Sequence, residues 1–329
     1  MCLVAGPLDA NPVRMRTLAL VAMLSCCFSC SGSNDGSTAA GGSATGGSGS
    51  ATGGTGSATG GTGSATGGMS ACASERAQLE QSMAAALEQA ALDPAITEVS
   101  DFTLALEAND GHRFVYSHGD SSLDTVYESA STSKWVAAVV ILDLVDRGVL
   151  SLSDEPSRWL PYWQVPGVTL ASLLSFTSGF SQEPLCINLK AANFADCVQR
   201  AYEANADIAP PAGSVFDYSS THLQVAGLMA VRAAQVTGWD ELFRAFQESS
   251  GLFPSALFDL PSLENPRLAG GMHWTAREYM LFLRALHDGT LLEPATRAAM
   301  LDNQRGEAKV VNSPALDAIN QDWAYGYGN

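Results

Sequence analysis

An almost unbroken apolar stretch at residues 135–145, WVAAVVILDLV, most constrains what this chain can fold into. A helix that is apolar on all sides has no face suited to water and is normally buried in the centre of a domain. Gly148 follows shortly and is a typical helix stop. We therefore predict one buried central helix around which the rest of the domain packs.

Ser131 and Lys134 stand at the start of this helix. Residues three apart lie on one helix face, so the hydroxyl and the amine can touch. A serine becomes a good nucleophile only beside a base, and a lysine serves as that base when burial or a nearby cation lowers its pKa. Of the three lysines, Lys134, Lys190 and Lys309, only Lys134 has a serine three residues before it. The structural alternative is a helix-capping serine with an extended surface lysine.

Length and charge narrow the class of protein. The chain has 329 residues, room for one large domain or two modest ones. Its net charge of −17 argues against nucleic-acid partners and against charge-driven adhesion to an anionic membrane.

The N-terminus has the pattern of an export signal, which we place at residues 1–30. Arg14 and Arg16 precede an apolar segment at residues 18–28 that is too short to span a bilayer. Cysteines follow at its end, and a cysteine after small residues resembles a bacterial lipobox. We expect lipid attachment at Cys30, with Cys26 as the second choice and an ordinary secretory signal as the alternative.

A low-complexity segment follows at residues 31–72. The motif GSATGGTG recurs between residues 49 and 68, with no large apolar side chain to bury. Such a segment is typical of a flexible tether, which agrees with a lipid anchor before a folded domain at residues 73–329.

Export would place the remaining cysteines in an oxidising compartment. Cys186 and Cys197 flank a short segment and could form a disulfide, which would leave Cys72 outside the pair. Two buried thiols are the alternative.

Periodicity predicts that the domain opens with a helix and a two-stranded hairpin, followed by a series of helices. We expect helices at residues 74–92, 131–147, 170–175, 194–204, 222–235, 239–248 and 276–287. Strands at residues 102–106 and 113–117 should form a hairpin around Asn109-Asp110-Gly111. Residues 268–275 read as a loop.

Five blocks then occur in one order: ESASTSK at 128–134, VDRGVLSLSD at 145–154, LSFTSG at 174–179, PAGSVFDYS at 211–219 and AGGMHWT at 269–275. Together they resemble the serine beta-lactamase-related superfamily, which includes class C beta-lactamases, DD-peptidases and beta-lactamase-like esterases. The resemblance covers residues 98–329. It implies an α+β fold, with an antiparallel sheet flanked by helices and a helical lobe.

The resemblance also implies roles for individual residues. Ser131 is the acylated nucleophile, Lys134 its amine partner, and Tyr218 the tyrosine of the second motif, which helps to move the proton. A tyrosinate beside a lysine ammonium could accept the serine proton. The backbone N–H of Ser131 would be one oxyanion donor. A half-buried core tyrosine is the alternative for Tyr218.

Two departures from the family pattern bear on the substrate. Where the family often has an asparagine, Ser220 stands, and it lacks the paired donor and acceptor of an amide. We still expect Ser220 to contact substrate. The third motif, Lys-Thr-Gly or His-x-Gly, has no good match: Lys309 lacks the glycine, and His287 precedes a helix stop at Gly289. We therefore expect the family's C-terminal strands to be missing from this chain.

The sequence therefore favours an exported serine hydrolase that forms an acyl-enzyme on Ser131. Its substrate would be a beta-lactam, a short ester or a D-amino peptide, with no cofactor, no metal and no nucleic acid. A Ser-His-Asp hydrolase is less favoured because no Gly-x-Ser-x-Gly motif occurs, and no histidine has the spacing of a zinc ligand. A non-catalytic envelope binding protein with the same fold is the alternative from another class.

Overall fold

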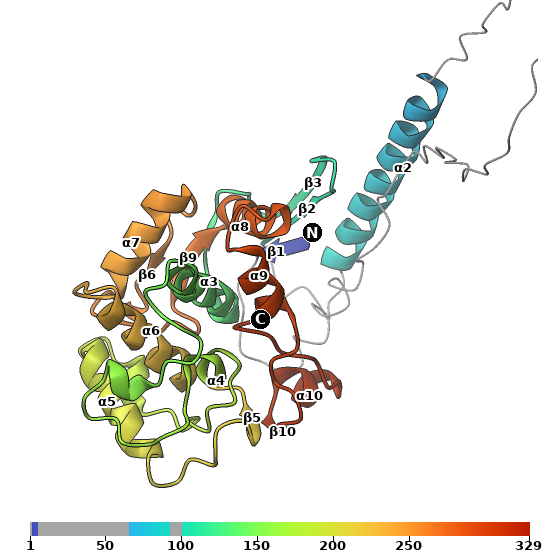
Figure 1. Cartoon of the computed structure of the whole chain (residues 1–329). Helices are drawn as coiled ribbons and strands as arrows, with labels where there is room; N and C mark the ends of the chain where they lie inside the picture. The colour runs from blue at the N-terminus through green and yellow to red at the C-terminus, as the bar shows by residue number, and fades with distance from the viewer. Residues whose placement is uncertain (1, 6–65, 93–100) are drawn as a thin grey trace, which may run out of the picture. The chain divides into compact units, whose positions relative to one another are not determined.

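A computed structural model describes residues 2–5, 66–92 and 101–329 (Figure 1). The apolar segment of the predicted export signal, Cys30 and most of the predicted tether lie outside the described residues. Within these ranges, no helix combines the length and apolarity needed to cross a bilayer.

The described residues fall into two compact units. Helix α2, Thr66–Ala91, makes up one of them. It begins eight residues before the predicted start at residue 74 and includes the end of the predicted tether. The added residues include Gly67 and Gly68, which are poor helix formers, so the sequence pattern did not predict this start.

The second unit opens with a hairpin. Strands β2, Phe102–Glu107, and β3, Arg113–His118, pair antiparallel, with Phe102 opposite His118. Gly111 in the turn has a φ of +81°, a conformation that glycine adopts without strain. Strand β1, Cys2–Ala5, pairs antiparallel on the other side of β2 and gives the order β1-β2-β3. The predicted hairpin is confirmed.

A second small sheet holds the chain just before Ser131. Its order is β4-β9-β6, from Val126–Glu128, Met272–Thr275 and Leu257–Phe258, all antiparallel. The prediction of a loop at residues 268–275 was therefore wrong for β9. Pairing with strands distant in the sequence creates this strand, and no local pattern reports such pairing.

Two further strand pairs are short. Strand β5, Val215–Asp217, pairs in parallel with β10, Lys309–Asn312. Strand β7, Pro261–Ser262, pairs antiparallel with β8, Asn265–Pro266. In the described part of the chain β10 is the only strand after residue 275, and it joins β5 rather than the hairpin sheet.

The predicted central helix is α3, Ser133–Asp146, and every residue from Val136 to Leu142 is buried. It packs against α6, Thr221–Ala233, which is also largely buried. In Figure 1, α3 runs through the middle of this unit. The surrounding helices are α4 Leu170–Leu174, α5 Phe194–Asn205, α7 Trp239–Ser250, α8 Ala276–Asp288, α9 Pro294–Leu301 and α10 Pro314–Ile319. The 3₁₀ turns are η1 Ala130–Thr132, η2 Pro156–Arg158 and η3 Leu185–Asn188.

The architecture is thus mixed α/β, with small antiparallel sheets and several helices, which confirms the predicted α+β class. Glycine ends two of the predicted helices as expected. Gly148 follows α3 with a φ of +69°, and Gly289 follows α8 with a φ of +73°. His287 therefore lies in the last turn of a helix, as the sequence indicated.

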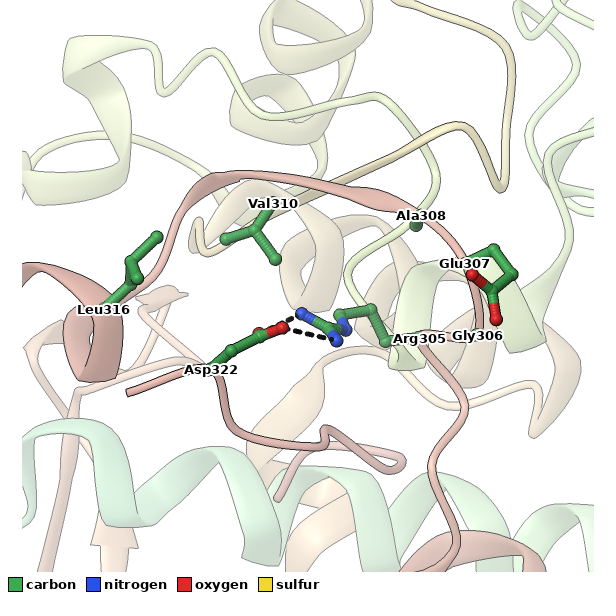
Figure 2. Close-up of a pocket in the computed structure, with 7 residues that line it drawn as sticks. All are labelled: Arg305, Gly306, Glu307, Ala308, Val310, Leu316 and Asp322. Carbon is green, nitrogen blue, oxygen red and sulfur yellow. Dashed lines mark hydrogen bonds and ion pairs between the residues drawn. The ribbon is translucent and has the colours of Figure 1, made fainter. Parts of the chain in front are cut away.

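The segment after α9 lines an open pocket of about 360 Å³ (Figure 2). Its floor carries an ion pair between the Arg305 guanidinium and the Asp322 carboxylate, with Nη2 of Arg305 donating to Oδ2 at 3.2 Å. The other lining residues are Gly306, Glu307, Ala308, Val310 and Leu316. None of these side chains is a nucleophile paired with a base.

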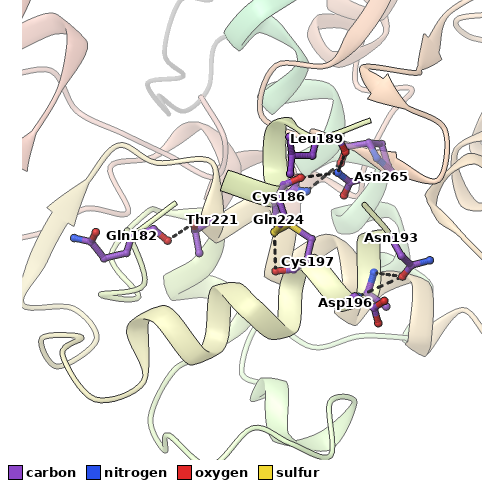
Figure 3. The surroundings of a disulfide bond; sticks show 11 residues. Gln182, Cys186, Leu189, Asn193, Asp196, Cys197, Thr221, Gln224 and Asn265 are labelled. Carbon is purple, nitrogen blue, oxygen red and sulfur yellow. Dashed lines mark hydrogen bonds between the residues drawn. A yellow bond between two sulfur atoms is a disulfide. The ribbon is translucent and has the colours of Figure 1, made fainter. Parts of the chain in front are cut away.

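A disulfide joins Cys186 in η3 to Cys197 in α5, with the Cα atoms 5.6 Å apart (Figure 3). Both residues are buried, in a small apolar cluster separate from the main core. The Asn265 side chain donates to the carbonyl of Cys186 at 2.8 Å and to that of Leu189 at 3.0 Å. The disulfide therefore ties η3 to α5, and the Asn265 hydrogen bonds tie η3 to β8.

Replacing both cysteines by serine should lower the free energy of unfolding by about 3 kcal/mol, because a short closed loop restrains the unfolded chain. Urea unfolding under non-reducing conditions measures the change. A reductant should lower the stability of the wild type to that of the double variant and leave the variant unaltered. Equal stability of both proteins in oxidising buffer would contradict a stabilising disulfide.

Candidate active site

Ser131 and Lys134 meet where the buried helix begins. Ser131 is exposed in η1, and Lys134 lies one turn on, in α3, with only 5% of its surface exposed. Lys134 Nζ lies 2.9 Å from Ser131 Oγ, within hydrogen-bond distance. The predicted contact between residues three apart therefore forms, with the hydroxyl facing solvent and the amine beneath it.

The loop at residues 269–271 forms one wall of this site. Lys134 Nζ donates to the carbonyl of Ala269 at 2.6 Å. Gly270 approaches Ala130, so that a Cβ there would lie 3.7 Å from the Ala130 carbonyl carbon, and a Cβ on Gly271 would lie 2.2 Å from the Leu260 carbonyl oxygen. The second of these contacts excludes any side chain at Gly271. Ala130 itself has a φ of +43°, an uncommon conformation for alanine directly before Ser131.

Burial makes Lys134 a candidate base. It lowers the pKa of the Lys134 amine to about 7, while the charge of Glu183 acts to raise this pKa and that of Arg267 to lower it. An ammonium is poorly solvated in this position, so the neutral amine is populated near neutral pH. The neutral form has the lone pair that a serine proton needs.

Tyr218 closes the site from the end of β5. Its ring lies under Lys134, with 4.6 Å from Nζ to the ring centroid. Burial raises the pKa of the Tyr218 phenol, and a hydrogen bond with Ser131 partly offsets this. The structure thus brings Ser131, Lys134 and Tyr218 together. The tyrosinate expected from the sequence is disfavoured, because desolvation penalises the phenolate and the lysine ammonium alike.

Asn312 in β10 holds the Tyr218 backbone. The Tyr218 N–H donates to the Asn312 carbonyl at 3.1 Å, and the Asn312 side-chain amide donates to the Tyr218 carbonyl at 2.9 Å. The ring of Phe176 packs 5.5 Å from that of Tyr218. Asn312 was not found from the sequence, since no motif connects residues 94 positions apart.

Ser220 lies beside an acidic residue that the sequence did not single out. The backbone N–H of Ser220 and the hydroxyl of Ser219 both donate to Oε1 of Glu183, the latter at 3.2 Å. Glu183 falls in residues 181–211, a segment too irregular for pattern analysis. The signal that could have pointed to it is the missing asparagine at position 220, which leaves room for another polar group.

The histidines do not assemble a Ser-His-Asp site. Burial lowers the pKa of His222 to about 4, so the ring is neutral. It lies between the Ser178 hydroxyl, 2.8 Å from Nδ1, and the Asp217 carbonyl, 2.9 Å from Nε2, and has a structural role. His273 Nδ1 pairs with Asp259 at 2.5 Å, but in the described ranges no serine hydroxyl bonds to this ring.

The two residues considered for the third motif are not among the contacts of Ser131 described above. Lys309 is exposed on β10, and His287 is in the last turn of α8. Searching the described residues also finds no group of three or more His, Cys, Asp or Glu side chains suited to a metal ion. The arrangement around Ser131 is therefore that of a nucleophile with a buried amine and a phenol.

A family model described as Beta-lactamase matches residues 103–328. That match covers well over half of the chain, so the chain belongs to the Beta-lactamase family, in a superfamily of serine hydrolases. The family resemblance predicted from the five blocks is confirmed.

Individual relatives agree with this assignment. Penicillin-binding protein 4 of Amycolatopsis lactamdurans is 31% identical over 129 residues, which are 37% of this chain and 33% of that protein. A candidate beta-lactamase from Bacteroides dorei DSM 17855 has 28% identity and a TM-score of 0.59, over 69% of this chain and 72% of that one. The D-amino acid amidase of Ochrobactrum anthropi SV3, at 20% identity and a TM-score of 0.51, covers 61% of this chain and 70% of its own and shows the fold alone.

Replacing Lys134 by methionine should stabilise the fold at low pH. The lowered pKa means that the unfolded chain binds more protons than the folded one between pH 7 and 10.5, so wild-type stability rises with pH across this window. The variant lacks this dependence. The free energy of unfolding of the variant should exceed that of wild type by most below pH 7. This difference should shrink by up to about 1.4 kcal/mol per pH unit above pH 7.

Urea unfolding at pH 6.5 and pH 9 measures this difference, with Lys190→Met as the control at an exposed lysine. A stability difference between Lys134→Met and wild type that does not change with pH would show that the amine keeps its ordinary pKa.

Proposed function

We propose that this protein is an exported serine hydrolase that cleaves an ester or amide through an acyl-enzyme on Ser131. The contact between the Ser131 hydroxyl and the buried Lys134 amine, 2.9 Å apart, carries the proposal. A hydroxyl beside a neutral amine of lowered pKa is the pairing that activates a serine.

In the proposed acylation step, Lys134 Nζ accepts the Ser131 proton while Oγ attacks the substrate carbonyl carbon. The carbonyl π-bond opens to an oxyanion, toward which the Ser131 backbone N–H donates from the first turn of η1. The intermediate collapses as the bond to the leaving group breaks. Tyr218 gives its hydroxyl proton to the leaving group and recovers one from the Lys134 ammonium. Water then hydrolyses the acyl-enzyme by the reverse proton route.

The substrate class we propose is a beta-lactam, a short ester or a D-amino peptide. A likeness to a penicillin-binding protein and to a D-amino acid amidase supports amide or ester cleavage of this kind. We propose that Ser220, which stands where the family often has an asparagine, contacts the acyl group of the substrate. Its position two residues after Tyr218 supports this proposal.

Labelling with a fluorophosphonate tests the nucleophile. We expect one label on the wild-type chain and none on Ser131→Ala, with p-nitrophenyl acetate hydrolysis reduced at least about 10³-fold. Ser153→Ala, at an exposed serine outside the site, is the matched control. The labelling rate should rise with pH around pH 7, since the neutral amine is the active form. Wild-type protein that folds but takes no label would favour the non-catalytic binding protein.

We also propose that the chain is a lipoprotein facing the periplasm or the cell surface, attached through Cys30 and tethered by the Gly/Ser/Ala/Thr-rich segment. The Cys186–Cys197 disulfide agrees with an oxidising compartment.

Radiolabelled palmitate fed to a bacterial expression host should label the wild-type chain and leave Cys30→Ala unlabelled. Cys26→Ala is the control and should keep the label and the membrane fractionation. If Cys26→Ala loses the label instead, lipid attachment is at Cys26. Absence of label from every form would indicate an ordinary secretory signal.

A further inference from the structure

We infer that the Glu183 carboxylate forms an ammonium-binding subsite beside Ser131, so that this hydrolase prefers acyl groups bearing a free, positively charged amine. The inference rests on the proposed function, because it names the substrate class of that same site. It concerns a residue outside the five sequence blocks.

The second motif itself holds Glu183 at the site. Oε1 accepts from the Ser220 backbone N–H and from the Ser219 hydroxyl at 3.2 Å. These residues directly follow Tyr218, whose ring centroid lies 4.6 Å from Lys134 Nζ. The three residues Tyr218–Ser220 therefore carry the proposed proton-transfer group and anchor the carboxylate, from which we infer that Glu183 lies close to the acyl group of a substrate bound at Ser131.

The backbone around Glu183 is held firmly in place. The buried Asn205 side chain accepts from the Gln182 N–H at 2.8 Å and donates to the Gln182 carbonyl at 3.0 Å. The Thr221 hydroxyl donates to that carbonyl as well, at 2.9 Å (Figure 3). The Ser219 hydroxyl shares its single proton between the Ser181 carbonyl, at 2.7 Å, and Oε1 of Glu183, at 3.2 Å. A carboxylate fixed in this way needs little reorganisation to bind a cation.

The Glu183 carboxylate can pair with a cationic group of a ligand. Among the described residues, no lysine, arginine or histidine lies within ion-pair distance of it, and Oε2 accepts no hydrogen bond. The side chain is exposed to solvent, so a ligand can reach it. Its negative charge acts to raise the pKa of the Lys134 amine, as expected for a carboxylate in the neighbourhood of that amine.

An ammonium is the group that best matches this arrangement. It offers charge-assisted hydrogen bonds to the free oxygen, whereas an acylated amine carries no charge and one donor at most. Ser220 in place of an asparagine removes the amide that would instead pair with an acylated amine. Amides, esters and short peptides of amino acids with a free amino group are therefore the expected substrates.

The test compares wild type with Glu183→Gln, which retains an oxygen to accept from Ser219 and Ser220. The substrates are alanine p-nitroanilide and its N-acetyl derivative, in both enantiomers. We expect the variant to lose about 10- to 100-fold in kcat/KM on the free-amine substrate and to change less than about 3-fold on the acetylated one. Glu248→Gln, at an exposed glutamate of α7, is the matched control.

An equal loss on both substrates would overturn the subsite, since it would mean that Glu183 acts only through Lys134.

Ligand-observed NMR with alaninamide tests the subsite independently of catalysis. Alaninamide should bind Ser131→Ala and bind the Ser131→Ala/Glu183→Gln protein at least about 10-fold more weakly. If fluorophosphonate fails to label Ser131, the proposed catalysis is wrong, and this binding difference alone decides the subsite. Equal binding to both proteins rejects it.

Discussion

The burial of one lysine amine is the constraint on which the site depends. Lys134 is itself 5% exposed and belongs to a helix whose residues from Val136 to Leu142 are buried, so its ammonium has little water around it. Its amine has hydrogen-bond partners in the Ala269 carbonyl and the Ser131 hydroxyl, and both of these groups are uncharged. Desolvation that would destabilise an ordinary core lysine here keeps the amine available as a base. The fold thus gives up stability at one position and sets a buried amine beside an exposed serine hydroxyl.

Segments distant in the sequence maintain that environment. Strand β9 pairs with β4 and sets the 269–271 loop against Ala130. Strand β10 pairs with β5, and Asn312 fixes the backbone of Tyr218. Small strand pairs of this kind contribute little as sheets, but each brings one wall of the site to the start of α3. Glu183, three residues before the disulfide-bonded Cys186, contacts Ser219 next to Tyr218.

Glu183 and Arg267 give the site opposite charges near one amine. The first acts to raise the pKa of Lys134 and the second to lower it, while burial outweighs both. Arg267 is bonded to Asn188 and to the Gly270 carbonyl, so it is held by neutral groups. Glu183 is likewise held only by neutral donors. An ammonium bound next to Glu183 would therefore also change the electrostatic balance around the Lys134 amine.

The sequence by itself determined the local features: the buried helix and its glycine stop, the Asn109-Asp110-Gly111 hairpin, and the contact between Ser131 and Lys134. All of these depend on residues a few positions apart, where periodicity and turn chemistry act directly. Only the tertiary structure decided that residues 272–275 form a strand, that Tyr218 stays protonated, and that Glu183 and Asn312 join the site. Strand pairing, desolvation and long-range hydrogen bonds arise from neighbours in space, which a local sequence pattern does not specify.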